Sequence, residues 1–192
     1  MSMGIIPKSF SSALNKHRQG AIILMELPEE HYFEANTSTI KLLIKKGYEG
    51  IYVSFHRPFK NISSLFTKAK VNINKLIFID VASSVHKENG GKNPRCVRIS
   101  PEIDIDELVS AIYTSLPKLK SRKRFIFIDS LNTITLYKNL SDVMRFAEFL
   151  SREVENHEVW NVILIFNVAK GLSQQKFIKD IAIRVHEVVN VT

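Results

Sequence analysis

The sequence contains one cysteine and no long apolar run. The single Cys96 excludes an internal disulfide and a zinc site built from cysteines. No apolar stretch approaches the roughly 20 residues that cross a membrane, and residues 1–20 lack the long apolar region of a signal peptide. We therefore expect a cytoplasmic protein that does not contact a membrane.

Acidic residues are scarce in the first half of the chain. Residues 1–99 contain 15 Lys and Arg but only 7 Asp and Glu, whereas residues 100–192 contain 12 of each. The formal net charge is +8, and the sequence pI is about 9.6. Such a lopsided positive charge indicates a polyanionic partner such as nucleic acid, although it carries no information about the fold.

The length and the apolar pattern predict one α/β domain over residues 1–192. Hydrophobic residues make up 45% of the chain, which is enough to build a core. The middle apolar runs are almost continuous, as in parallel strands covered on both faces, and the last run alternates like an edge or antiparallel strand. The predicted strands are residues 21–27, 50–55, 75–81, 124–130, 161–168 and 183–191.

Helical patterns lie between these runs, which predicts a three-layer α/β fold with right-handed crossovers. Gly47 stands where a C-cap glycine belongs, and Ser141 stands where an N-cap belongs. Residues 1–17 are predicted to be an N-terminal extension, and residues 84–100 are predicted to be a mobile loop. The predicted helices are residues 37–48, 61–71, 104–116 and 141–155.

Over residues 18–190 the order of these pieces resembles the RecA/KaiC-like P-loop ATPase family, and its archaeal branch in particular. The run "GAIILMEL" resembles the strand that leads into the Walker A loop of that family. The run "RFIFIDSLNTITLY" resembles its Walker B strand, in which an apolar run ends in an aspartate, here Asp129, followed by Ser130. The resemblance implies a three-layer α/β/α RecA-like fold with a mostly parallel central sheet, and side-by-side assembly of domains.

The position of the Walker A loop reads "ELPEEHYFEANTSTIK", which contains no glycine, and Gly-Lys-Ser/Thr occurs nowhere in the chain. In the family, glycines let backbone N–H groups wrap the phosphates, and the lysine neutralises them. Glu29, Glu30 and Glu34 instead add negative charge at this position. Each carboxylate would repel a phosphate by about 3 kcal/mol at roughly 5 Å in a surface-like dielectric.

His56 and Arg57 occupy the position of the family's water-activating carboxylate, after the second strand. An arginine cannot act as a general base at neutral pH, and His56 would need a substrate already held nearby. Asn167 stands where related ATPases carry a polar sensor of the γ-phosphate, and without a phosphate loop we expect it to be structural. The resemblance therefore predicts a degenerate domain that binds no cofactor and is not an enzyme.

Asp129 leaves two interpretations open. It either holds a metal ion, with Ser130 or with Asp80 at another strand end, or caps the following turn by accepting a backbone N–H group. Asp80 and Asp129 together would support phosphate-ester hydrolysis. Four aromatic residues near the missing phosphate loop either fill an empty nucleotide pocket or form an apolar patch for a partner. These aromatic residues are Tyr32, Phe33, Phe55 and Phe59.

Two basic clusters and one further arginine are candidates for nucleic-acid contact. The cluster "KLKSRKR" (118–124) has five cations in seven residues, and the second cluster lies in the loop 84–100. Contacts to phosphates would give salt-sensitive binding without sequence preference, whereas a solvated helix end favours the same residue types. The candidates are Arg57, Lys92, Arg95, Arg98, Lys118, Lys120, Arg122, Lys123 and Arg124.

Three functions are therefore open. The first is a non-catalytic protein-binding or regulatory module that acts through a protein partner or a homo-oligomer. The second is a DNA-binding accessory factor in recombination or repair that uses the basic clusters. The third is a metal-dependent hydrolase built on Asp80 and Asp129.

Overall fold

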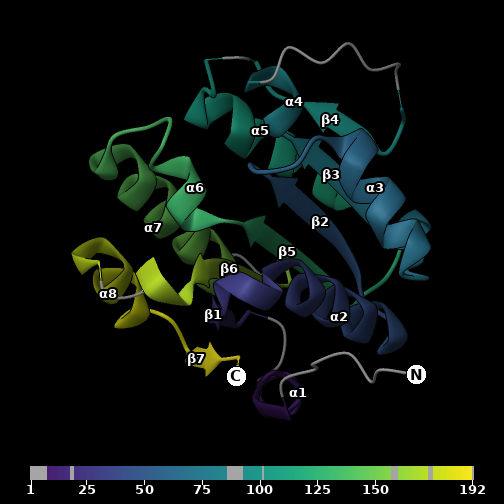
Figure 1. The fold of residues 1–192 in the computed structure, drawn as a ribbon, viewed down its shortest axis with the longest axis horizontal. Helices are drawn as coiled ribbons and strands as arrows, with labels where there is room; N and C mark the ends of the chain where they lie inside the picture. Colours follow the sequence, from purple (N-terminus) through teal and green to yellow (C-terminus); the bar gives the residue numbers. More distant parts are fainter. Residues whose placement is uncertain are drawn as a thin grey trace.

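The computed structural model describes residues 8–17, 20–85, 93–100, 102–156, 160–172 and 175–191 (Figure 1). The strands are β1 (Ile22–Leu27), β2 (Glu49–Ser54), β3 (Leu76–Asp80), β4 (Cys96–Arg98), β5 (Arg124–Asp129), β6 (Val162–Ala169) and β7 (Glu187–Asn190). The α-helices are α1 (Lys8–Lys16), α2 (Tyr32–Lys45), α3 (Phe59–Lys68), α4 (Ala82–Val85), α5 (Ile105–Ser115), α6 (Leu131–Ile134), α7 (Leu140–Asn156) and α8 (Lys176–Ala182). Short 3₁₀ turns are η1 (Glu29–His31), η2 (Ile73–Lys75), η3 (Leu116–Lys118) and η4 (Lys170–Leu172).

The strands form one seven-stranded sheet in the order β4-β3-β2-β5-β6-β1-β7, and every pair of neighbours is parallel. The predicted three-layer α/β/α fold is therefore confirmed. The last predicted strand is β7, an edge strand that pairs in parallel with β1. The prediction of a loop throughout 84–100 is wrong at the end of α4 and at β4, whose three residues are too few to show a pattern; residues 86–92 lie outside the described residues.

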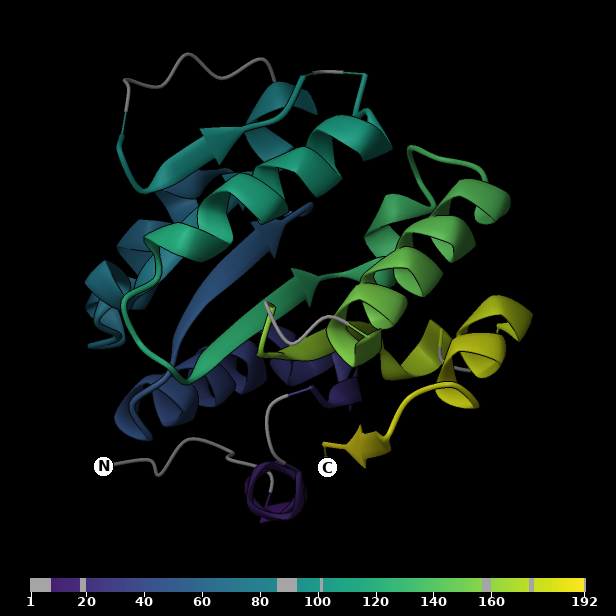
Figure 2. The same cartoon turned by 180° about the vertical axis from the view of Figure 1, so that it is seen from behind.

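Alternate residues of each strand pack against opposite helical layers. Phe125 and Phe127 of β5 belong to the core beneath α1, α2 and α3. Ile126 and Ile128 belong to the core beneath α5, α6, α7 and α8. Figure 2 shows α5 and α7 in front of the sheet and α2 behind it. Because both faces are covered, the strands are almost continuously apolar, which is why they could be predicted.

The predicted N-terminal extension contains α1, which packs on the sheet. Its Phe10, Ala13 and Leu14 are buried in the same core as α2 and α3. The helix lies beside β7, and Lys46 Nζ donates to Asn15 Oδ1 at 3.1 Å. The described part of α1 is thus a structural element of the domain. No helix in the described part of the chain is both long and apolar enough to cross a membrane.

Three helices begin earlier than predicted. Helix α3 begins at Phe59 instead of Asn61. Helix α2 begins at Tyr32 instead of Thr37, because η1 turns the chain into the helix directly after Pro28. Helix α7 begins at Leu140, and the side chain of Asn139, not Ser141, accepts a hydrogen bond from the Asp142 backbone N–H at 2.9 Å. The early start of α2 makes most of the degenerate Walker A position helical.

Candidate functional site

The carboxyl ends of the parallel strands meet at one edge of the sheet, which is where ligands bind in open α/β folds. Asp129 ends β5 at this edge, Asp80 ends β3, and Ser54 ends β2 between them. The first turn of α2 covers the same edge and brings Tyr32 over the sheet. We therefore take this edge as the candidate site.

Asp129 is buried, and two tyrosines hold both of its carboxylate oxygens. Tyr32 Oη donates to Asp129 Oδ1 at 2.6 Å, and Tyr52 Oη donates to Asp129 Oδ2. Burial raises the pKa of Asp129, and the two tyrosine hydrogen bonds act in the opposite direction. Burial and the neighbouring Asp129 charge raise the pKa of both tyrosines well above the usual value, so both remain proton donors. Among the described residues, the Asp129 carboxylate accepts hydrogen bonds from these two tyrosines and from no backbone N–H, so the interpretation of Asp129 as a cap of the following turn is wrong.

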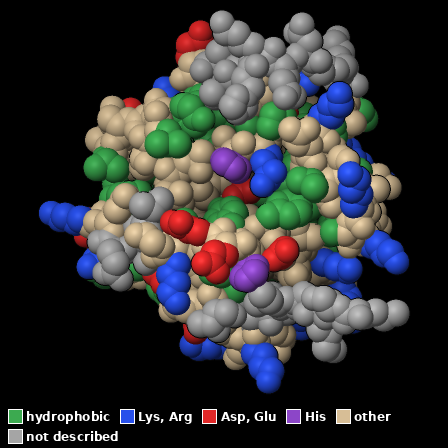
Figure 3. Space-filling view, viewed as in Figure 1, with side chains coloured by type: hydrophobic (Ala, Val, Ile, Leu, Met, Phe, Trp, Pro, Cys, Tyr) green, Lys and Arg blue, Asp and Glu red, His purple; other side chains and the backbone are tan. Residues whose placement is uncertain are grey.

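Aromatic and acidic side chains fill the position where a phosphate loop would lie. Phe33 stacks on Phe66 with 6.1 Å between ring centroids, and the Arg57 guanidinium lies 5.3 Å from the centre of the Phe33 ring. The Glu29 carboxylate packs against Gly171. A Cβ atom added to Gly171 would lie 2.9 Å from Oε1 of Glu29. Figure 3 shows acidic side chains and a histidine grouped near the middle of this view. This surface offers carboxylates to a ligand.

The four predicted aromatic residues divide between the two cores. Tyr32 and Phe33 pack against the core beneath α2, and Phe59 packs on Phe78 with 5.1 Å between ring centroids. Phe55 is buried on the other face of the sheet. Tyr32 and Phe33 therefore lie where the sequence predicts the missing phosphate loop, whereas Phe55 belongs to the opposite core.

Asn167 lies beneath α2 and is fully buried. Its Nδ2 atom donates to Asn36 Oδ1 at 2.7 Å, which connects β6 to α2. Its Oδ1 atom has no hydrogen-bond partner in the described part of the chain. The contact supports the structural role expected for Asn167.

The Asp80 carboxylate accepts hydrogen bonds from the backbone and does not contact Asp129. It accepts the Phe59 N–H at 2.8 Å, the Ser83 N–H at 2.9 Å and the Ser83 hydroxyl. Asp80 therefore caps α3 and the turn into α4. Strand β2 separates β3 from β5, so the two aspartates are two strand spacings, about 9–10 Å, apart. Within the described ranges, no group of three His, Cys, Asp or Glu side chains could hold a metal ion.

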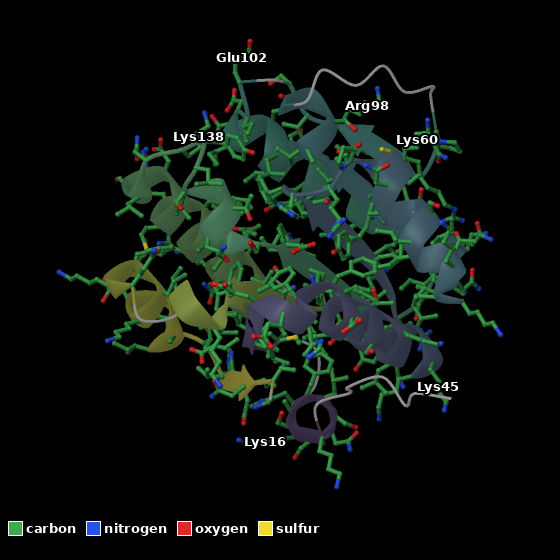
Figure 4. All side chains as sticks on the ribbon, in the orientation of Figure 1. Lys16, Lys45, Lys60, Arg98, Glu102 and Lys138 are labelled. Atoms are coloured by element: carbon green, nitrogen blue, oxygen red, sulfur yellow. The ribbon has the colours of Figure 1, made fainter. Side chains whose placement is uncertain are left out.

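The structure divides the predicted basic residues between opposite edges of the sheet. Arg57 follows β2, and Arg95 and Arg98 flank or end β4. Residues 118–123 instead precede β5, and Arg124 begins it, at the amino-terminal edge. Figure 4 shows Arg98 at the far side of the molecule from Lys45, which ends α2 beside the start of β2. The described clusters therefore do not form a single surface; Lys92 lies outside the described residues.

Tyr52 and Glu49 are two buried polar residues that the sequence pattern did not predict. Tyr52 reads as part of a continuous apolar strand, yet its hydroxyl binds Asp129 on the neighbouring strand. Glu49 is buried at the start of β2 and binds Lys75. A polar atom within an otherwise apolar strand was the available signal in both cases, because buried polar groups require partners.

The parallel sheet and its strand order, with an aspartate ending β5, define a RecA/KaiC-like fold. No protein-family model matches the sequence, and no curated protein matches it. The uncharacterized protein PH0321 from Pyrococcus horikoshii, solved in complex with an unknown peptide, has a TM-score of 0.70 at 13% identity over 96% of this chain and 82% of its own. The KaiC-like protein PH0186 from Pyrococcus horikoshii OT3 has a TM-score of 0.63 at 16% identity over 97% of this chain and 79% of its own. At these identities the similarity establishes the fold alone.

Proposed function

We propose that this chain is a RecA/KaiC-like domain of the archaeal KaiC-like type whose Walker A motif is degenerate. It neither binds nor hydrolyses ATP, and it acts as a protein-binding or regulatory module. The hydrogen bond from Tyr32 to Asp129 is the observation that carries this proposal. In the ATPases that this fold resembles, the equivalent aspartate serves a nucleotide-bound Mg²⁺ ion.

The energetics of Asp129 support the loss of nucleotide binding. A metal ion could reach its carboxylate only after Tyr32 and Tyr52 had moved away. Each hydrogen bond to a charged group contributes about 1.5–3 kcal/mol. Glu29 and Glu30 in the preceding turn would repel the phosphates at the same time. The degenerate Walker A position has no glycine, and its one lysine, Lys41, donates to the Ala69 carbonyl at 3.1 Å instead.

An exposed apolar surface supports the protein-binding role. Leu136, in the connection between α6 and α7, is 75% exposed, and Leu140, at the start of α7, is 52% exposed. Tyr137 in the same connection is also exposed. Lys138, between the two leucines, lines a groove of about 540 Å³ between α5 and α7. Ile105 and Phe149 contribute apolar side chains to this groove. Exposed apolar residues beside a groove are typical of protein interaction sites.

A peptide segment of a partner protein is the occupant that we propose for this surface. The groove combines apolar side chains with charges of both signs, including Asp106 and Arg152, which suits a mixed-sequence peptide. The structural neighbour PH0321 was solved in complex with an unknown peptide. Both observations favour a protein ligand over a nucleotide for this chain.

A thermal-shift titration with ATP and MgCl₂ tests the loss of nucleotide binding. We expect ATP with MgCl₂ to leave the melting temperature of the wild type unchanged, because the wild type has no phosphate loop. We expect the same for Tyr32→Phe, because removing the tyrosine hydroxyl does not create a phosphate loop. Calorimetry with ATP and Mg²⁺ provides a second readout. A rise in melting temperature of several degrees in the wild type, which linkage requires of a bound ligand, would overturn the proposal.

A further inference from the structure

We propose that the amino-terminal edge of the sheet binds the phosphate backbone of duplex nucleic acid without reading its sequence. We call this surface the basic edge; it comprises residues 45–49, 68–75 and 118–124. The first segment joins α2 to β2, the second joins α3 to β3, and the third joins α5 to β5. Because β3, β2 and β5 are neighbouring parallel strands, these connections meet at one edge. The inference does not depend on the proposed protein-binding role.

The basic edge carries a dense positive charge. Its segments contain two, three and five Lys or Arg residues respectively, and Glu49 is their one acidic residue. Most of these cations are exposed. The exposed ones are Lys45, Lys68, Lys70, Lys75, Lys118, Lys120, Arg122 and Lys123. Figure 3 shows Lys and Arg side chains along the right-hand margin, where Figure 1 places α3 and the end of α2.

Glu49 connects two of the segments from inside the protein. Its Oε1 atom accepts Lys75 Nζ at 2.9 Å, and its Oε2 atom accepts the Lys120 N–H at 2.7 Å. Burial alone would raise the pKa of Glu49, but the hydrogen bonds from Lys75, Lys120 and Ser121 lower it overall. The single carboxylate is therefore buried, ionised and paired, and it organises the lysines without presenting negative charge to a ligand.

Further hydrogen bonds join the third segment to the first. Ser121 Oγ donates to the Gly47 carbonyl at 2.8 Å, and Lys123 Nζ donates to the Lys46 carbonyl at 3.3 Å. Lys41, one turn before Lys45, donates to the Ala69 carbonyl at 3.1 Å and so connects α2 to the end of α3. These hydrogen bonds therefore join the three segments into one continuous surface.

The helix dipole accounts for only part of this charge. Lys45 and Lys68 lie in the last turns of α2 and α3, where cations stabilise the helix. Lys120, Arg122 and Lys123 lie in the loop between η3 and β5, beyond any α-helix terminus. Lys123 donates to the carbonyl of Lys46, the C-cap residue of α2, but no helix end accounts for the charges of Lys120 and Arg122, which is the reason for assigning this loop to a ligand.

The chemistry of the basic edge fits a duplex better than a single strand. Single strands stack their bases on exposed aromatic rings. The ring in this region is Tyr48, which is only 8% exposed and lies 5.7 Å beneath Lys123 Nζ. Phosphate contacts need only positioned cations, and these contacts carry no sequence information.

Fluorescence anisotropy with a labelled DNA duplex of about 25 base pairs tests the inference, using the full chain. With about three phosphate contacts, raising NaCl from about 50 to 200 mM should weaken binding about 40-fold. We expect K120Q/R122Q/K123Q to bind at least about tenfold more weakly at the lower salt and to lose most of the salt dependence. The same duplex in RNA form shows whether the site accepts both nucleic acids.

The matched control is K60Q/K176Q/K179Q, which removes the same charge from exposed lysines of α3 and α8. It should bind within about twofold of the wild type. No binding by the wild type at low salt, or an equal loss in both variants, overturns the assignment. Tighter binding to a single strand, or a tenfold preference among duplex sequences, overturns the duplex-backbone mode. Should K120Q/R122Q/K123Q not fold, as judged by circular dichroism, K45Q/K118Q replaces it under the same criteria.

Discussion

The hydroxyl of Tyr32 donates a 2.6 Å hydrogen bond to the carboxylate of Asp129, which lies 97 positions further along the chain. Tyr32 opens the helix that occupies the Walker A position, and Asp129 ends the Walker B-like strand. The two positions that would hold a nucleotide and its metal ion in an active relative are thus bound to each other. The proposed loss of ATP binding follows from this contact.

Tyr32→Phe should lower the free energy of unfolding by about 1–3 kcal/mol, because a buried carboxylate loses one of its two donors. Urea denaturation of wild type and variant measures the difference. Tyr137→Phe changes an exposed tyrosine in the same way and should shift stability by less than about 0.5 kcal/mol. Equal effects of the two substitutions would show that the contact with Asp129 adds no stability.

Tyr52→Phe should change the alkaline dependence of stability. Burial and the Asp129 charge raise the pKa of Tyr52 well above its usual value. Above about pH 10 the unfolded chain loses this proton while the folded chain keeps it, so the free energy of unfolding falls by up to about 1.4 kcal/mol per pH unit. The variant lacks this contribution, so its stability should fall less steeply between about pH 9.5 and 11.

Phe10→Leu serves as the control for that measurement, because it weakens a buried part of the core and removes no titratable group. Its stability should be lower than that of the wild type by a similar amount at every pH. Parallel curves for the wild type and Tyr52→Phe would contradict the raised tyrosine pKa. Urea denaturation at each pH provides the values.

Gly50→Ala should destabilise the sheet through one identifiable clash. A Cβ atom at Gly50 would lie 2.4 Å from the ring of Phe125 on the neighbouring strand. Overpacking of this kind costs about 1–3 kcal/mol. Gly50→Ala should lower the free energy of unfolding less in a Phe125→Leu background than in the wild type. A double-mutant cycle measures this difference.

Gly47→Ala provides the contrast to Gly50→Ala. A Cβ atom at Gly47 would meet no atom within 4 Å, but its φ of +88° is strained for any L side chain. The expected cost is about 1 kcal/mol and should not change with Phe125→Leu. If Phe125→Leu also lowered the cost of Gly47→Ala, its rescue of Gly50→Ala would not be evidence of a specific clash between residue 50 and Phe125.

Asp80→Ala should cost more stability than Asp104→Ala. Asp80 is fully buried and accepts hydrogen bonds from Phe59 and Ser83, whereas Asp104 is an exposed cap of α5 that accepts the Asp106 N–H at 2.9 Å. An exposed cap contributes about 1 kcal/mol, and the buried donors left by Asp80→Ala add about 1–3 kcal/mol more. Thermal denaturation of both variants checks the order; the reverse order would contradict the role assigned to Asp80.

Leu136→Ser/Leu140→Ser should weaken peptide binding without lowering stability. Both side chains are more than half exposed, so the fold does not depend on them. Peptides selected on the wild type from a random display library should bind the double variant at least about tenfold more weakly, as burial of two leucines would supply about 3 kcal/mol or more. Unchanged binding by the variant, or no enrichment on the wild type, would argue against this docking surface.

The apolar pattern predicted β5 and β6 to within one residue, because strands covered on both faces leave an unbroken hydrophobic run. The start of α2 was placed five residues too late, since Tyr32 and its neighbours have no helical apolar period and their helix is fixed by contacts with β5. Strand β4 was missed because its three residues are too few to carry a periodic signal. Local pattern thus predicts elements whose burial repeats along the chain, and it fails where a single distant contact sets the boundary.

The sequence by itself determined the layered α/β fold and the lack of a Gly-Lys-Ser/Thr phosphate loop. Only the tertiary structure decided that the hydroxyls of Tyr32 and Tyr52 both bind Asp129. It also decided that Glu49, at the opposite edge, binds Lys75 and Lys120 from separate segments. The physical reason is that side-chain burial repeats locally along a strand or helix, whereas the neighbours of a strand end depend on the order of the strands in the sheet. That order brings together residues that are far apart in sequence, and no local period encodes it.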